Sequence, residues 1–240
     1  MRRWIIRLAC LGVALAAAAL LMLAFGINRA VKEGIERGGS KAAQAPITVG
    51  RVSISPFSGE GRIEDLVVGN LEGFSSPSAF QSGSIRLRWK PSSLLSDPIA
   101  IRSVEVDAPQ IFCEAGLGGN NLNRIADNVT AYIEQSRLLD EFTRKLAIEE
   151  FVIRGGQLTL QLKGVSILKT KVSLPEIRLE NLGGDKGGIT PAELTLKVLG
   201  ALLERVGAAA GDNLPRMGVR APSTPPRDTR PDAAGESGRR

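Results

Sequence analysis

A broken alternation of apolar and other residues runs through the middle of the chain. Residues 49–54 (VGRVSI) and 63–68 (IEDLVV) share one spacing: apolar, two others, apolar, one other, apolar. Side chains three positions apart lie on opposite faces of a regular strand. Keeping both on one buried face needs an extra residue, as in a β-bulge or a turn between short strands. The spacing therefore predicts strands that bend.

The same spacing recurs at residues 101–106 (IRSVEV) and again 47 residues later, at 148–153 (IEEFVI). Both segments continue alike, with Pro109 or Gly156 followed by Gln and an apolar residue. This internal repeat predicts a sheet that curls into a trough with one apolar side. A single curled sheet that closes on its own core would use the same device. The residues expected on the buried face, each near a bulge or strand break, are Val104, Val106, Phe151 and Ile153.

Regular alternation appears at residues 85–89 (IRLRW) and 158–162 (LTLQL). Strands of this kind bury one face and leave the other wet, which is typical of antiparallel sheet. We therefore expect a β-rich, α+β protein. Its parts are an N-terminal transmembrane helix, a curved antiparallel sheet with bulged repeats, two amphipathic helices and a disordered C-terminal tail.

The first amphipathic helix is predicted within residues 120–145. Its apolar stripe consists of Leu122, Ile125, Val129, Tyr132, Ile133, Leu139 and Phe142. The second begins with Thr190-Pro-Ala-Glu193, which matches a capping box with proline at the first helical position, and is expected to end at Gly207. Helices of this kind cover the apolar face of a sheet or lie on a membrane surface.

Residues 8–27 carry no charge and are long enough, at about 1.5 Å per residue, to cross the hydrocarbon core of a bilayer. Three arginines precede them, so the positive-inside rule places residues 1–7 in the cytoplasm and the rest of the chain across the membrane. A cleaved signal peptide is the alternative. Its apolar region would be unusually long, and no small-x-small site follows at the right distance. Residues 28–46 are then expected to be a linker.

Composition argues against an enzyme. The chain has no histidine, which removes the usual general base and the commonest metal ligand. Cys10 and Cys113 lie far apart, and no separated carboxylate pair stands out. We expect no catalytic residue, no cofactor and no metal.

The net charge of +6 comes from the two ends of the chain, residues 1–7 and 213–240. A nucleic-acid-binding protein carries basic residues on its folded surface, interleaved with aromatic ones, so we expect no nucleic-acid partner. The basic, proline-rich residues 212–240 are predicted to be disordered. They are either a solvated extension or a basic arm that touches anionic lipid head groups or cell-wall polymer.

Several motifs in order resemble a known family: residues 49–61, Val68-Gly-Asn-Leu-Glu-Gly-Phe74, Ser93-Leu-Leu-Ser-Asp97, and Glu114 through Leu122. Over about residues 1–205 the chain resembles short, single-span bacterial members of the AsmA-like superfamily. The resemblance implies a single-pass anchor in the inner membrane of a Gram-negative bacterium and a β-rich domain, residues 47–211, in the periplasm. Larger members form curved grooves with apolar interiors and are implicated in moving phospholipid or in outer-membrane assembly. The family is not enzymatic.

The expected function is therefore to bind lipid in an apolar β-groove, or to assist lipid transport and outer-membrane biogenesis. The expected partners are membrane lipids, phospholipid first, and an envelope protein. The alternative is a structural envelope protein that binds no lipid and pairs with a partner through sheet edges. The residues predicted to line a groove are Ile54, Leu66, Val68, Leu87, Trp89, Val106 and Leu160. If the two amphipathic helices close over these side chains, the same face becomes an ordinary dry core.

Overall fold

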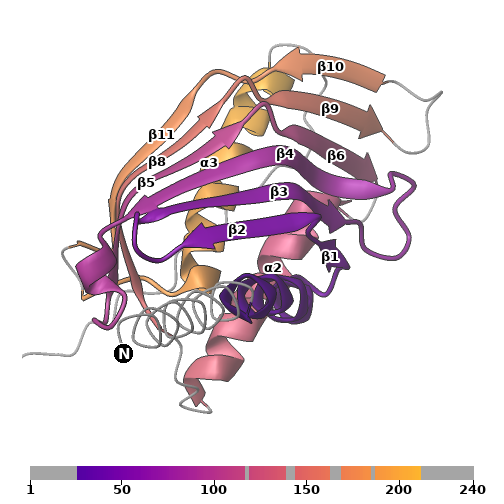
Figure 1. Ribbon diagram of the computed structural model, residues 1–240. Coiled ribbons are helices and arrows are strands. Elements are labelled where there is room, and N and C mark those ends of the chain that lie inside the picture. The colour runs from indigo at the N-terminus through magenta and orange to yellow at the C-terminus, as the bar shows by residue number, and fades with distance from the viewer. Residues whose placement is uncertain (1–25, 117–118, 139–143, 163–168, 185–186, 212–240) are drawn as a thin grey trace, which may run out of the picture.

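The computed structural model describes residues 26–116, 119–138, 144–162, 169–184 and 187–211. The predicted segments 1–7 and 212–240 lie outside these residues, as does nearly all of the predicted span 8–27. Among the described residues, no helix is both long and apolar enough to cross a membrane. These residues form an α+β structure, in which one bent sheet carries helices on one side (Figure 1).

In the described residues the sheet has eleven strands. They are β1 (Ile47–Thr48), β2 (Arg51–Ser55), β3 (Glu60–Gly69), β4 (Ser78–Trp89), β5 (Ile99–Asp107), β6 (Gln110–Gly116), β7 (Gly119–Asn120), β8 (Leu146–Arg154), β9 (Gln157–Leu162), β10 (Lys169–Ser173) and β11 (Ile177–Leu182). The helices are residues 26–43, the 3-10 turn η1 (Pro91–Ser93), α2 (Asn121–Leu138) and α3 (Pro191–Gly211).

The internal repeat is realised as neighbouring parallel strands. Ile101 of β5 pairs with Ile148 of β8, and Ile111 of β6 pairs with Leu158 of β9, both in parallel. All other pairs among the described strands are antiparallel. The sheet is therefore mixed, and the prediction of an antiparallel sheet fails at these two pairs. The physical reason is that two equivalent segments running in the same direction need a crossover, which α2 supplies.

The breaks between β1 and β2, β5 and β6, β8 and β9, and β10 and β11 line up with one unpaired position in β3 and β4. The pairing registers place Gly50, Asp65, Gly83, Ala108, Gly155 and Pro175 in one line, here called the crease. Asp65, Ala108 and Gly155 have positive φ angles of 54°, 43° and 63°. At the crease the alternation of inward-facing and outward-facing side chains shifts by one residue. Ile63 and Leu66, on either side of it, therefore both pack on the core. The predicted bend at this spacing is confirmed, and it runs through every row of the sheet.

A second irregularity explains the other two copies of the spacing. The β4–β5 register shifts between Arg88 and Trp89, which leaves Arg102 as an extra residue in β5. Asn181 of β11, with φ of 53°, lies two strands away on the same line. The four side chains predicted on the buried face near these breaks are all buried: Val104, Val106, Phe151 and Ile153.

Helices α2 and α3 pack on the inner face of the sheet, as predicted. The capping box at α3 is present, because Thr190 Oγ1 accepts from Glu193 N at 3.2 Å and Glu193 Oε2 accepts from Thr190 N at 3.0 Å. The helix does not end at Gly207 but continues to Gly211, since three alanines follow and favour helix strongly. Of the first helix's predicted stripe, Leu139 and Phe142 lie outside the described residues.

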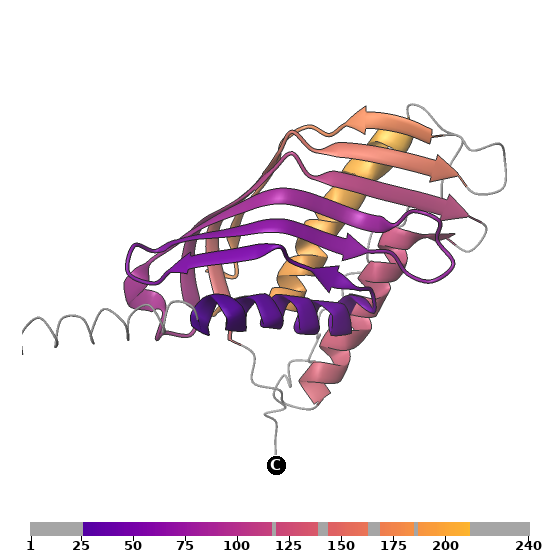
Figure 2. The same cartoon turned by 45° about the vertical axis from the view of Figure 1, so that its right-hand side comes forward.

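Residues 26–43 form a helix that lies along β1 and β2 (Figure 2), although residues 28–46 were predicted to be a linker. The linker prediction overlooked a polar periodicity that docks this helix, described below.

Candidate apolar binding face

One side of the sheet, the inner face, carries apolar side chains from both sides of the crease. They form a single cluster with side chains from α2 and α3. From β5, β6, β8 and β9 the cluster takes Ile101, Val104, Val106, Ile111, Cys113, Ile148, Phe151, Ile153, Leu158 and Leu160, and from the two helices it takes Leu122, Ile125, Val129, Leu202, Leu203 and Val206.

The structure places all seven predicted groove residues in this cluster or against it, but not alike. Trp89, Val106 and Leu160 are buried, with 7%, 4% and 1% of their surfaces exposed. The other four are only half-buried: Ile54, Leu66, Val68 and Leu87. The inner face is thus closed over most of β5, β6, β8 and β9. On β2, β3 and β4 these four side chains stay half-buried, although Ile85 and Trp89 of β4 are buried.

Helix α3 shows the same gradient along its length. Leu202, Leu203 and Val206 in its second half are buried, whereas Leu194, Leu196 and Val198 in its first half are half-buried. Half-buried apolar side chains thus occur both on β2, β3 and β4 and at the beginning of α3.

Trp89 carries a polar atom into this region. Its Nε1 is buried and has no hydrogen-bond partner in the described part of the chain. A buried donor without an acceptor costs about 1–3 kcal/mol. The indole also lies close over Gly61, where a Cβ would stand 2.8 Å from the ring atom Cζ3. An apolar ligand with one oxygen acceptor would suit these surroundings.

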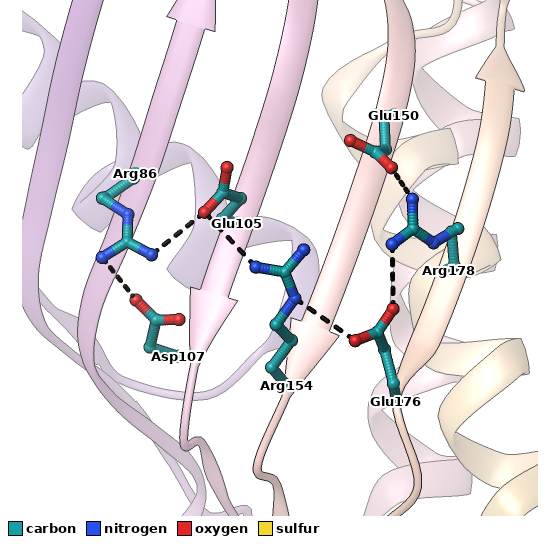
Figure 3. Close-up of polar contacts among 7 residues, drawn as sticks. All are labelled: Arg86, Glu105, Asp107, Glu150, Arg154, Glu176 and Arg178. Carbon is teal, nitrogen blue, oxygen red and sulfur yellow. Dashed lines mark hydrogen bonds and ion pairs between the residues drawn. The ribbon is translucent and has the colours of Figure 1, made fainter.

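The outer face of the sheet is charged instead (Figure 3). Arg86 contacts Glu105 and Asp107 at 3.0 and 2.9 Å. Arg154 lies between Glu105 and Glu176 at 3.9 and 3.2 Å. Arg178 pairs with Glu176 and Glu150. This chain of ion pairs crosses β4, β5, β8 and β11.

The pKa of Glu105 is held low chiefly by its hydrogen bond to Arg86, and the pKa of Glu176 by its hydrogen bond to Arg178. Each of the four carboxylates in this chain of ion pairs has an arginine partner. Val152, between Glu105 and Arg178 in the strand register, is fully buried under this layer. Charged residues alternating with apolar ones in β4 and β5 were the sequence signal for it.

Two motifs that carry the family resemblance meet in a buried polar cluster. Glu114 is fully buried and accepts hydrogen bonds from the backbone amides of Ser75 and Ser76 at 2.7–2.9 Å. Asn121, also fully buried, donates to Asn70 Oδ1 at 3.2 Å and accepts from Glu114 N at 2.9 Å. Burial raises the pKa of Glu114, but the amides of Ser76 and Ser75 outweigh it, so the net shift is downward. The cluster fixes the loop between β3 and β4.

The edge formed by β1 and β2 is covered by the helix of residues 26–43. Its polar side chains at every fourth position contact the edge backbone. Asn28, Glu36 and Ser40 accept from the amides of Ile54, Val49 and Ile47 at 2.7, 2.9 and 2.8 Å, and Lys32 donates to Gly50 O at 3.2 Å. These four residues, the edge stripe, occupy backbone groups that a further strand would need. The four-residue polar spacing could have been found in the sequence.

Among the described residues, no group of three or more histidine, cysteine or acidic side chains could hold a metal ion. The sequence matches no protein-family model, and no curated protein matches it. The resemblance to the AsmA-like superfamily therefore remains a prediction. What the described residues define is a class of structure: an α+β protein whose mixed, creased sheet has one charged face and one apolar face under helices.

Proposed function

We propose that the protein is a membrane-anchored protein of the cell envelope, of the AsmA-like type, that holds phospholipid on the incompletely covered part of its inner face. In this proposal residues 8–27 are a single-pass inner-membrane anchor and residues 47–211 lie in the periplasm. The protein performs no chemistry and serves lipid transport or outer-membrane biogenesis.

One observation carries the proposal. The unpartnered Nε1 of Trp89 lies in an apolar region where Ile54 and Leu87 remain half-buried. An acyl chain would return about 0.8 kcal/mol for each methylene it buries there. An ester or phosphate oxygen of the same lipid would supply the acceptor that the indole lacks.

Native mass spectrometry of the full chain, extracted from membranes in mild detergent, tests this proposal. We expect phospholipid to co-purify with the wild type. Leu87→Glu should lose it, because the charge enters the half-buried region. Arg88→Glu is the matched control, since Arg88 is the exposed neighbour on the outer face of the same strand, and it should retain lipid.

Trp89→Phe sharpens the test, because it removes Nε1 and keeps most of the ring. If a lipid oxygen accepts from the indole, this variant retains less lipid than the wild type. If no lipid is found with any form of the protein, the inner face is a dry core. This result would favour the alternative, a structural envelope protein that binds no lipid and pairs with a partner through sheet edges. That alternative would have to use the β10–β11 side, since the edge stripe occupies the β1–β2 edge.

A further inference from the structure

Two large apolar side chains stand out on the surface. Phe57 and Leu95 are the exposed large hydrophobic residues of the described chain, with 78% and 96% of their surfaces exposed. Neither contributes to the core. Single exposed apolar residues are common on soluble proteins, so their significance depends on where they lie.

Both belong to the same end of the sheet. Phe57 is in the β2–β3 turn, and Leu95 is in the connection from β4 to β5 that contains η1. The two loops are in contact, because Trp89 N donates to Gly59 O at 2.8 Å and a Cβ on Gly59 would meet Pro91 at 3.0 Å. These two loops, residues 56–59 and 90–98, are called the tip.

The predicted membrane span ends beside the tip. The helix of residues 26–43 is docked with Asn28 against Ile54, three residues before Phe57. The span is predicted to end at Ile27. Because Asn28 is fixed to the strand that leads into the tip, an anchor over residues 8–27 would leave the membrane at this end of the sheet. Figure 2 shows that the helix lies lengthwise under β2, so its far end lies away from the tip.

Three basic residues lie at the apolar tip, together with one exposed acid, Asp97. Arg144 donates to the carbonyls of Leu94 and Ser96 at 2.8 and 2.7 Å, on either side of Leu95. Lys145 and Lys90 are exposed nearby. Apolar side chains flanked by lysine and arginine suit the boundary between anionic head groups and acyl chains.

We propose that the tip is a second membrane contact, in which Phe57 and Leu95 enter the interfacial layer of the bilayer that holds the anchor. The occupant of this surface is lipid head group and upper acyl chain, not a protein. The inference rests on the proposed anchor but not on lipid binding at the inner face. It would hold the beginning of α3 and the half-buried region close to the membrane, since Leu146 at the start of β8 bridges to Ile189 just before α3.

Site-directed fluorescence of the full chain tests the tip. The chain carries Cys10→Ser and one added cysteine, Leu95→Cys or Phe57→Cys, is labelled with a polarity-sensitive dye, and is reconstituted in vesicles of phosphatidylethanolamine and phosphatidylglycerol. Burial raises the pKa of the Cys113 thiol to about 12, so this residue should not label near pH 7. We expect a blue shift of the dye at both tip positions, and loss of emission when the lipids carry nitroxide near the head group.

Glu72→Cys is the matched control, because Glu72 is an exposed loop residue at the opposite end of the sheet, between β3 and β4. Its dye should stay in water. A second series places the dye through Ser58→Cys and adds Phe57→Asp and Leu95→Asp, which should return that dye to an aqueous spectrum. Because both side chains are exposed, these changes should not unfold the domain.

The outcomes separate the tip from the anchor. A chain that resists carbonate extraction while its tip dyes match the Glu72→Cys control would overturn the tip proposal and leave the anchor intact. A chain that carbonate releases from the vesicles would overturn both. Lipid retention in the Leu87→Glu variant is measured separately, by native mass spectrometry. A loss of bound lipid there would therefore not imitate either of these results.

Discussion

The inner face of this sheet divides into two regions with the same kind of side chain and different surroundings. Over β5, β6, β8 and β9, aliphatic residues such as Leu160 lie beneath α2 and α3 and are buried. Over β2, β3 and β4, equally apolar residues such as Leu87 remain half-buried. An apolar strand pattern therefore marks a face that needs covering, and the packing of helices decides whether it becomes core or candidate binding surface.

A charge should separate the two regions most strongly. Leu160→Glu buries a carboxylate in the closed region and should cost more than about 4 kcal/mol, enough to unfold the domain. Leu87→Glu should cost about 1–2 kcal/mol, because its carboxylate can reach water. Thermal unfolding followed by circular dichroism measures both, with Thr159→Glu, the half-buried neighbour of Leu160 on the other face, as control. Equal losses at the two leucines would show that the inner face is closed throughout.

Glu114→Gln should have the next largest effect, about 2–3 kcal/mol, because the fully buried carboxylate accepts charge-assisted hydrogen bonds from the loop between β3 and β4. The pKa of Glu114 is lowered in the folded state. Its contribution is therefore complete above the unfolded pKa of about 4.3 and is lost as pH falls through the lower folded pKa.

Urea unfolding at several pH values checks this result. The difference in unfolding free energy between wild type and Glu114→Gln should be largest at neutral pH and shrink in acid. A difference that does not change with pH would mean that the carboxylate charge contributes nothing.

Two glycines of the sheet sharpen the comparison further. Gly61→Ala should cost about 1–3 kcal/mol and change the emission of Trp89, since the added Cβ would overlap the indole at 2.8 Å. Gly83→Ala meets no atom within 4 Å and should be neutral, or stabilising by about 0.5 kcal/mol. Urea unfolding with tryptophan fluorescence measures both. Unchanged emission of Trp89 in Gly61→Ala would mean that the half-buried region accommodates the added methyl group without strain.

The edge stripe should give the smallest effect. Glu36→Ala removes the acceptor of Val49 N and should cost about 0.5–1.5 kcal/mol. Arg37→Ala, on the exposed side of the same helix, should cost less than about 0.5 kcal/mol. Hydrogen exchange is the sharper measurement, because the amide of Val49 should exchange faster only in Glu36→Ala. Unchanged exchange would show that the helix is not held through this contact.

Local patterns in the sequence were enough for the bends in the strands and for the start of α3, but not for the helix of residues 26–43. The spacing of Ile63 and Leu66 requires a bend, because both side chains are apolar and three positions apart, and Asp65 provides it with a positive φ. Thr190 and Glu193 start α3 through bonds that only neighbouring residues make. The seven groove candidates all lie in the apolar cluster or against it, since strand alternation fixes which side chains share a side, and their role as a groove stays a prediction.

The sequence by itself determined which residues are strand, where strands bend and which face is apolar, because these follow from interactions within a few residues. Only the tertiary structure decided that β5 and β8 run parallel, that the helix of residues 26–43 covers an edge, and that Leu160 is buried while Leu87 is not. Each of these depends on how distant elements meet. Apolar periodicity specifies that a face must be covered, and it carries no information about how far a helix from elsewhere in the chain extends over it.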